Sequence, residues 1–361
     1  MILQHYKSLK QKFIQTIYFR YVNYNLNKKL IHDIQISRTG KTLIKKGTEG
    51  RSSISGHIAT IFGATGFLGR YLVNNLAKQG TTIIIPWRDQ DSKRHLKILG
   101  DLGQIVMMEF DLRDETSIKE SIRHSNIVYN LIGRDYETKN FSYEDVHIHG
   151  AVKIAKACIE YNIDRLVHIS TLNANIKSPS NFYKTKALGE EAVRNIFPEV
   201  TIVRPSIMFG AEDHFLNYLA STKILLTTNN NRELIRPTYV KDVARALELI
   251  MFDESTTGQI YELYGPQEYS IAEIITMITH ITHCRQWHLN VSKSIFSIIA
   301  SALNLLWWPT ISPDQAQTQC IDYKITNNAK TYTHLGIKPQ HLDKLAFKYL
   351  RMHQFSNNAY M

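Results

Sequence analysis

The sequence predicts an α/β fold, a doubly wound parallel sheet of the Rossmann type with a smaller, mainly helical C-terminal portion. From Ser55 to about Ile250, short apolar runs alternate with longer amphipathic stretches. The apolar runs are rich in β-branched residues and lack a polar alternation, which is typical of strands buried on both faces. A glycine-rich turn follows the first run directly. Strands and helices that alternate in this way form a parallel sheet.

Six apolar runs are predicted strands. They are HIATIFG at 57–63, TTIIIPW at 81–87, GQIVMMEFDL at 103–112, NIVYNLIG at 126–133, RLVHIS at 165–170 and VTIVRP at 200–205. The stretches between them have helical periodicity, as in GRYLVNNLAKQG at 69–80, which ends in a glycine, and EDVHIHGAVKIAKACIEYN at 144–162. After residue 250 the pattern loosens into helical pieces and loops.

The length and composition favour a globular protein of more than one unit. With 361 residues, 43% hydrophobic and 21% charged, the chain is neither fibrous nor wholly disordered. We expect a basic extension over 1–51, a dinucleotide-binding domain over 52–250, and a smaller C-terminal domain over 251–361 that is interleaved with it. The three cysteines lie far apart, so they indicate neither a disulfide framework nor a metal site.

The positive charge is concentrated at the start of the chain. Residues 1–51 hold eleven basic and two acidic side chains, whereas the other 310 residues hold 32 basic and 30 acidic ones. A nearly neutral body gives no reason to expect a nucleic-acid partner. No acid occurs before Asp33, and basic and bulky apolar residues alternate there, which indicates a mitochondrial presequence. A solvated basic tail is the alternative.

The stretch SIFSIIASALNLLWW at 294–308 is apolar and uncharged. Its fifteen residues are few for a helix that crosses a bilayer. Its aromatic end suits a helix at a membrane interface or against an apolar partner. A buried helix of the smaller domain is the equally weighted alternative.

The turn after the first strand has the spacing GxxGxxG, from Gly63 to Gly69. The first glycine can make the tight turn, Gly66 leaves room for a pyrophosphate, and Gly69 lets the helix pack closely on the strand. Phosphate oxygens would meet free N–H groups at a positive helix end. The sequence therefore predicts dinucleotide binding at this turn.

The end of the second strand indicates which dinucleotide is bound. Arg88 follows the strand directly, and a guanidinium there would bind the 2′-phosphate of NADPH. Asp89 is near enough to favour the ribose hydroxyls of NADH, but it lies one residue further on, so NADPH is preferred. Asp111, after the third strand, could accept a hydrogen bond from the adenine amine. Alternatively, it is the N-cap of a helix over 115–123.

With these motifs in place, the chain resembles the extended and atypical short-chain dehydrogenase/reductase superfamily over residues 52–265. It is most similar to one branch, the NAD(P)H-binding accessory subunits of mitochondrial respiratory complex I. The glycine motif is common to the superfamily, whereas NLIGRDYETKNF at 130–141 and LNANIKS at 172–178 are specific to the branch. The other supporting stretches are GRSSISG at 50–56, ATIFGATGFLGRYLVN at 59–74, GDLGQIV at 100–106 and FLNYLAS at 215–221.

The resemblance also shows where catalysis is expected to be lost. Active members of the superfamily have a Tyr-x-x-x-Lys pair whose phenol exchanges a proton with the substrate. The matching lysine is Lys186, and Phe182 stands four residues before it. Tyr183 is the neighbour of Phe182, about 100° around the helix axis from the required position. We therefore expect no catalytic residue, although Tyr183 leaves an alternative.

The resemblance implies a cofactor site that keeps its ligand. Thr171 occupies the hydroxyl position, Lys186 can clamp the ribose, and Gly133 lets a loop pass close to the cofactor. Pro205 and Ser206 resemble the segment beside the nicotinamide. The expected cofactor-binding residues are Gly63, Thr65, Gly66, Phe67, Leu68, Gly69, Arg88, Asp111, Leu112, Leu131, Ile132, Gly133, Thr171, Lys186, Pro205 and Ser206.

The resemblance thus implies a non-catalytic accessory subunit of complex I that holds NADPH as a structural cofactor and supports assembly of the matrix arm near the membrane. Other subunits of the matrix arm and quinone region would be its partners, on the matrix side of the mitochondrial inner membrane. The alternative is an active NAD(P)-dependent nucleotide-sugar epimerase or reductase that uses Tyr183. A redox-sensing NADPH-binding protein is a third hypothesis.

Overall fold

The computed structural model describes residues 32–47, 53–222, 224–227, 231–283, 287–292, 295, 314–318, 321–326 and 329–358. The predicted presequence before residue 32 lies outside the described residues. So does the apolar stretch 294–308, with the exception of Ile295.

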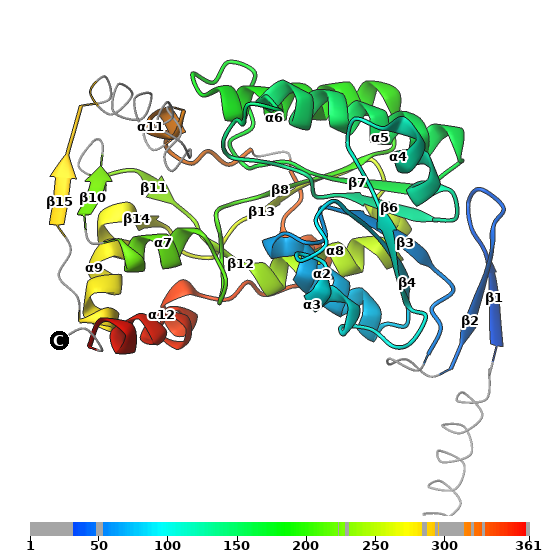
Figure 1. Cartoon of the computed structure of the whole chain (residues 1–361), viewed down its shortest axis with the longest axis horizontal. Helices are drawn as coiled ribbons and strands as arrows, with labels where there is room; N and C mark the ends of the chain where they lie inside the picture. Colours follow the sequence, from blue (N-terminus) through cyan, green and yellow to red (C-terminus); the bar gives the residue numbers. More distant parts are fainter. Residues whose placement is uncertain are drawn as a thin grey trace, which may run out of the picture.

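A seven-stranded sheet forms the centre of the molecule (Figure 1), with the strand order β13-β8-β7-β6-β3-β4-β5. All neighbouring strands in it are parallel. The strands are β3 (Ile58–Phe62), β4 (Thr82–Trp87), β5 (Ile105–Glu109), β6 (Ile127–Asn130), β7 (Arg165–Ile169), β8 (Thr201–Pro205) and β13 (Ile260–Leu263). The strand order reverses between β3 and β6, so the predicted doubly wound sheet is confirmed, and all six predicted strands form.

The strand β13 lies in the region where the sequence predicts only helical pieces and loops, so that expectation is wrong at this position. Its four residues, IYEL, have a glutamate in the middle, which interrupts the apolar run. Glu262 is nevertheless fully buried, because Arg204 of β8 and the backbone N–H of Thr326 hydrogen-bond with its carboxylate. The compensating partners are distant in the sequence, and the strand pattern alone gives no sign of them.

Helices cover both faces of the sheet. Figure 1 shows α4 (Glu115–Ile122), α5 (Gly150–Glu160) and α6 (Asn181–Ile196) on one face, with α2 (Phe67–Lys78) and α8 (Val240–Phe252) on the other. The alternating strand residues divide the core accordingly. In β3, Ala59 and Ile61 belong to the cluster under α2 and α8, whereas Phe62 belongs to the cluster under α4 and α5.

The ends of the predicted helices differ in detail from the structure. The stretch that begins with EDVHIH opens as a π-helix, η1 (Asp145–His149), before α5. The N-cap of α4 is Asp114, whose carboxylate accepts hydrogen bonds from the backbone of Thr116 and Ser117. The alternative role of Asp111 as this N-cap is therefore wrong. Asp111 lies three residues earlier, and its carboxylate accepts from the Arg113 N–H instead.

The C-terminal portion packs beside the carboxyl end of the sheet (Figure 1). Its elements and the remaining short ones are α3 (Arg94–Lys97), β9 (Met208–Phe209), α7 (Phe215–Ser221), β10 (Ile224–Thr227), β11 (Leu234–Ile235), β12 (Thr238–Tyr239), η3 (Glu254–Thr256), β14 (Tyr269–Ser270), α9 (Ile271–Thr282), β15 (Trp287–Asn290), α11 (Gln315–Thr318), η4 (Tyr332–Leu335) and α12 (Leu342–Asn358). Of the described residues, no helix combines the length and apolarity that crossing a bilayer requires.

A hairpin of β1 (His32–Ile36) and β2 (Thr42–Lys46) precedes the sheet and was not predicted. Its turn is fixed to the amino end of the sheet, where Thr39 donates to the Asp164 carboxylate through both its N–H and its hydroxyl. The outer face carries Ile34 opposite Ile44, and both side chains are more than half exposed.

Candidate nucleotide site and adjoining cavity

The sequence-predicted site residues lie just beyond the carboxyl ends of neighbouring parallel strands. The glycine turn follows β3, Arg88 follows β4, Asp111 follows β5, Leu131 to Gly133 follow β6, and Thr171 follows β7. Pro205 ends β8, and Ser206 comes next. Because parallel strands end at the same edge, the topology brings these residues together at the point where the strand order reverses. The hydrogen bonds and pKa values at this edge indicate which of these side chains can bind a nucleotide.

The glycine turn has the backbone geometry that its spacing predicts. Gly63 has φ +80°, and a Cβ there would lie 3.0 Å from the carbonyl carbon of Leu131 in the next strand's loop. A Cβ on Gly69 would lie 2.5 Å from the Cα of Ala64, so the first turn of α2 packs directly on the backbone after β3. Gly66 is the N-cap of α2, and no side chain caps that helix end. The free N–H groups there suit a phosphate.

Arg88 and Asp89 have different surroundings. Arg88 is exposed immediately after β4. The Asp89 carboxylate accepts a hydrogen bond from the Ser92 N–H at 3.1 Å, and this bond lowers the pKa of Asp89. The carboxylate is thus engaged in its own turn, whereas the guanidinium of Arg88 is available to an anion.

The loop after β6 is shaped by a polar side chain that the sequence analysis did not single out. The Asn130 side chain accepts from the Ile132 N–H at 3.1 Å, and its amide nitrogen lies 3.2 Å from Nδ1 of His168. Burial lowers the pKa of His168 to about 3, with a smaller contribution from Lys186. The signal in the sequence is an asparagine at the end of an otherwise apolar strand.

Lys186 is buried between the ends of β6 and β7. Its ammonium donates to the Ile169 carbonyl oxygen at 3.3 Å, and a Cβ on Gly133 would lie 2.8 Å from its Nζ. Burial lowers the pKa of Lys186 to about 8, and Glu190 opposes that shift. An ammonium has three donors, so two remain for other partners such as ribose hydroxyls.

Phe182 belongs to an aromatic cluster. Its ring lies 5.5 Å from the His147 ring and 6.1 Å from the Tyr143 ring, centroid to centroid. Nδ1 of His147 lies 3.0 Å from the Thr185 hydroxyl, and Nε2 accepts from the Arg134 N–H. Burial and the nearby Lys186 lower the pKa of His147 to about 2. This imidazole is therefore neutral at physiological pH.

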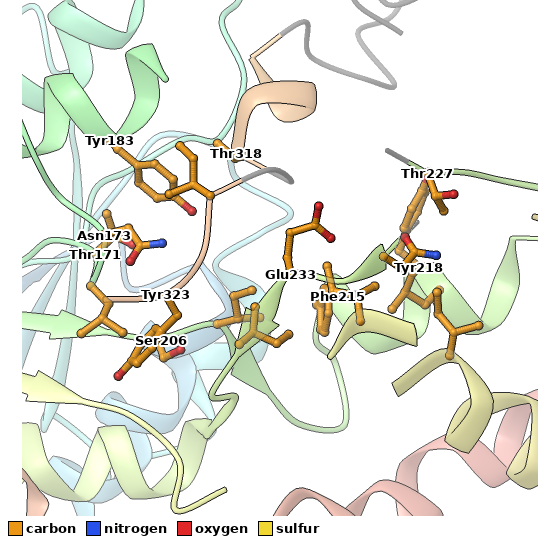
Figure 2. Close-up of a pocket in the computed structure, with 18 of the residues that line it drawn as sticks. Thr171, Asn173, Tyr183, Ser206, Phe215, Tyr218, Thr227, Glu233, Thr318 and Tyr323 are labelled. Atoms are coloured by element: carbon orange, nitrogen blue, oxygen red, sulfur yellow. The ribbon is translucent and has the colours of Figure 1, made fainter. Parts of the chain in front are cut away.

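Tyr183 points into a cavity of about 230 Å³ that adjoins the strand ends. Figure 2 shows Tyr183 with Thr171 and Asn173 at one end of this cavity. Burial raises the pKa of Tyr183, while a hydrogen bond with Asn173 lowers it. Sequence reasoning placed Tyr183 out of register with Lys186. It did not predict the cavity, because the cavity walls come from segments far apart in the chain.

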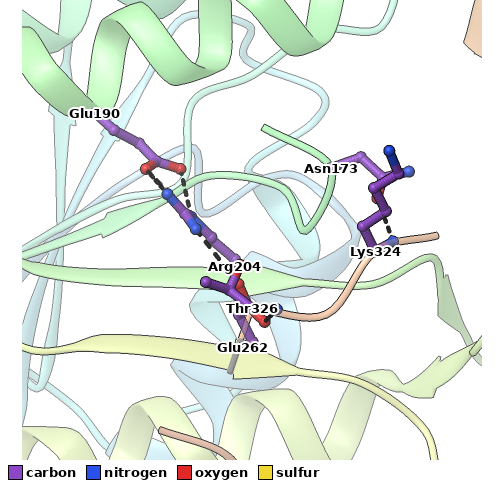
Figure 3. A network of polar contacts seen from close by, with 6 residues as sticks. All are labelled: Asn173, Glu190, Arg204, Glu262, Lys324 and Thr326. Atoms are coloured by element: carbon purple, nitrogen blue, oxygen red, sulfur yellow. Dashed lines mark hydrogen bonds and ion pairs between the residues drawn. The ribbon is translucent and has the colours of Figure 1, made fainter. Parts of the chain in front are cut away.

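An ion-pair network (Figure 3) fixes α6, the helix that carries Phe182, Tyr183 and Lys186. Arg204 of β8 donates through Nε and a terminal nitrogen to Glu190 of α6, at 3.0 and 2.6 Å. Another terminal nitrogen lies 3.3 Å from Glu262 of β13. Glu262 also accepts from the Thr326 N–H at 2.9 Å, and Asn173 accepts from the Lys324 N–H at 3.2 Å.

The part of the chain that the structure describes contains no group of three His, Cys, Asp or Glu side chains placed to hold a metal ion. The parallel sheet, the glycine turn and the helices on both faces together define a protein of the Rossmann fold class. The sequence matches the NAD dependent epimerase/dehydratase family over residues 59–263, from β3 to β13.

Comparison with individual proteins identifies a narrower group within this family. The chain is 51% identical to the mitochondrial NADH-ubiquinone oxidoreductase 40 kDa subunit of Neurospora crassa over 338 residues, 93% of this chain and 89% of that one. It is 40% identical to the mitochondrial NADH dehydrogenase (ubiquinone) 1 alpha subcomplex subunit 9 of Arabidopsis thaliana over 326 residues, 85% and 81% of the two chains. The structure of Citrobacter sp. triphenylmethane reductase with NADP(H) has the same fold, with a TM-score of 0.63 at 14% identity over 81% of this chain and 99% of that one.

The chain therefore belongs to the NAD dependent epimerase/dehydratase family and, within it, to the family of mitochondrial complex I subunits that these two relatives represent.

Replacing Gly63 tests the turn, and Gly103 offers a matched control. Both have φ +80°, but a Cβ at Gly63 meets Leu131, whereas a Cβ at Gly103 meets nothing within 4 Å. We expect Gly103→Ala to cost about 1–2 kcal/mol of unfolding free energy from backbone strain alone. Gly63→Ala should cost more and weaken NADPH binding at least tenfold, measured by urea unfolding and calorimetric titration. Equal effects of the two variants on NADPH affinity would contradict this interpretation of the turn.

The buried imidazoles predict acid sensitivity. His147 and His168 stay neutral in the folded state, but they titrate near pH 6.5 once the chain unfolds. The unfolded state thus binds more protons below about pH 6.5, and the unfolding free energy falls as pH decreases from there toward about 3. Between pH 6.5 and 5.0 each histidine should cost about 2 kcal/mol.

Urea unfolding at pH 7.5 and 5.0 measures this loss. His168→Gln should reduce it by about 2 kcal/mol, because one strongly shifted imidazole is removed, while His147 and the partly buried His57 and His95, whose pKa values burial also lowers, still contribute. The control is His124→Gln, which changes an exposed histidine and should leave the loss as in the wild type. A loss that persists unchanged in the His168 variant would exclude this cause.

Proposed function

We propose that this chain is a non-catalytic accessory subunit of mitochondrial complex I that binds NADPH as a structural cofactor and supports assembly and stability of the matrix arm near the membrane. One observation supports it above the others. The nucleotide-binding features at the strand ends are complete, while a phenylalanine packed against His147 stands where the active enzymes have their proton donor.

The residues at the sheet edge fit the cofactor. Gly63, Gly66 and Gly69 have no Cβ and so leave room for a pyrophosphate. The buried Lys186 ammonium donates to the Ile169 carbonyl oxygen, and its other N–H groups can bind ribose hydroxyls. Ser170 Oγ is also buried without a hydrogen-bond partner among the described residues. The reduced nicotinamide ring carries a transferable hydride, which a structural cofactor keeps. The protein holds it through the sixteen residues that the sequence predicts, from Gly63 in the turn to Ser206 after β8.

The residues that follow β4 favour NADPH over NADH. The exposed Arg88 guanidinium can bind the additional phosphate, and Asp89 is already hydrogen-bonded within its own turn. The Citrobacter reductase, which has the same fold, was solved with NADP(H). NADH is the less favoured form.

A tightly held nucleotide stabilises the folded chain by RT ln(1 + [L]/Kd), about 4 kcal/mol at a thousandfold excess over Kd. Such a contribution governs whether the subunit persists long enough to assemble. The partners would be other complex I subunits of the matrix arm and quinone region, and the location the matrix side of the inner membrane. Residues 52–250 and 251–361 would act as two interleaved domains, because β13 of the second joins the sheet of the first.

A second candidate function comes from Tyr183. Its side chain lines the same cavity as Thr171, which occupies the strand-end hydroxyl position that accompanies the catalytic tyrosine in active enzymes of this fold. An epimerase or reductase that uses Tyr183 in place of Phe182 would follow.

Two measurements decide between the functions. We expect the chain to co-migrate with a very large membrane assembly on native gels of detergent-solubilised mitochondria. We also expect its bound NADPH to stay reduced when carbonyl or nucleotide-sugar compounds are added. Repeated substrate-dependent oxidation that Tyr183→Phe abolishes would favour the enzyme and overturn the proposal.

Arg88→Ala should weaken NADPH binding by about 10–100-fold, because a charge-assisted hydrogen bond to phosphate contributes about 1.5–3 kcal/mol. NADH affinity should change little, since that nucleotide lacks the phosphate. Arg94→Ala is the control, because Arg94 is exposed nearby on α3 and pairs with Asp91. Calorimetric titration with both nucleotides measures the effect. Parallel losses for NADPH and NADH would show that Arg88 does not select the phosphate.

A further inference from the structure

The cavity beside the nucleotide site contains a carboxylate that the proposed function does not use. Glu233 is only 2% exposed, and its Oε1 is buried without a hydrogen-bond donor among the described residues. Figure 2 shows this side chain projecting into the cavity between Phe215 and Thr318. We propose that the cavity is a second ligand site, which takes a small apolar molecule with a protonated amine that pairs with Glu233.

The charge of the ligand follows from the cost of the buried carboxylate. A buried carboxylate without a partner is strongly unfavourable, and an opposite charge with a hydrogen bond compensates it. None of the ion pairs between described residues includes Glu233. The nearby Arg236 pairs with Glu268, and Arg232 is exposed. A ligand ammonium would supply the missing donor and the missing charge together.

The remaining walls determine the body of the ligand. Aliphatic side chains from α7, β10, β11 and α9 surround the cavity, namely Leu219, Leu225, Ile235, Ile271 and Ile275. These aliphatic walls suit an alkyl chain or a ring. The polar lining residues Thr171, Asn173, Tyr183 and Ser206 lie on the side of the cavity that faces the nucleotide site. An apolar cavity of about 150 Å³ holds benzene, so about 230 Å³ suits an amine of about eight carbons.

One wall of the cavity is a segment with its own anchors. Tyr323 and Ile321 line it from residues 321–326. This segment is held to β11, since the Tyr323 N–H donates to the Leu234 carbonyl and Asp322 accepts from the Leu234 N–H. The Tyr323 hydroxyl is a further buried group without a partner among the described residues. The wall is thus built into the fold and is present before any ligand arrives.

Calorimetric titration of the full chain carrying its nucleotide tests the site, with octylamine, 1-octanol and octanoate as probes. We expect saturable binding of octylamine, at least tenfold weaker binding of octanol, and no binding of octanoate. Glu233→Gln should weaken octylamine binding at least tenfold and leave NADPH affinity unchanged. Glu248→Gln is the matched control, because Glu248 is also buried but accepts from Gln79, the C-cap residue of α2, and octylamine binding should not change.

Two further readouts keep the test independent of folding defects. Without amine, Glu233→Gln should raise Tm, since a neutral amide replaces an uncompensated charge; a marked fall in Tm would reveal an internal partner and overturn the proposal. Ile207→Trp, at a partly exposed position of the wall, should block octylamine binding by filling the cavity.

Two further outcomes would overturn the proposal. One is octanol or octanoate binding as tightly as octylamine, and the other is unchanged octylamine binding in both the Glu233 and the Ile207 variants. NADPH titration reports separately on the proposed function.

Discussion

The ion pairs of Arg204 hold together the parts on which the site depends. Arg204 joins β8 to α6 through Glu190 and to β13 through Glu262, and α6 carries Phe182, Tyr183 and Lys186. Breaking one partner of a buried pair leaves an uncompensated charge, at a cost of about 3–5 kcal/mol. The network also reaches residues 324–326, so the sheet, the lysine helix and the wall of the cavity are positioned by one set of polar contacts.

The site combines a closely packed glycine turn and a buried lysine with a phenylalanine, Phe182, four residues before that lysine. Gly63, Gly69 and Lys186 have the close packing and burial that a nucleotide site needs. The Phe182 ring packs in an aromatic cluster with His147 and Tyr143. This packing stabilises α6 against η1, and the Phe182 ring itself carries no acidic or basic group. The side chain at this position of α6 thus contributes to packing.

Local patterns predicted most of the fold, because buried parallel strands and the glycine turn are encoded by neighbouring residues. The six strands, the turn and the positions of Arg88 and Lys186 at the sheet edge follow from such patterns. The strand β13 was missed because Glu262 breaks its apolar run and is compensated from Arg204 and Thr326. The cavity with Glu233 was missed for a related reason. Its walls come from α7, α9 and residues 321–326, which only the tertiary structure brings together.

The contacts of residues 324 and 326 join a late segment of the chain to much earlier ones. Lys324 bonds to Asn173 across 151 positions, and Thr326 bonds to Glu262 across 64 positions. The strands β3 to β8 therefore do not include the segment that completes these two contacts. A product that terminates prematurely near residue 320 would keep its sheet but leave the Glu262 carboxylate short of a donor and the cavity open on one side. The aliphatic lining of the cavity would then be accessible to proteases, which distinguishes an incomplete chain from a finished one.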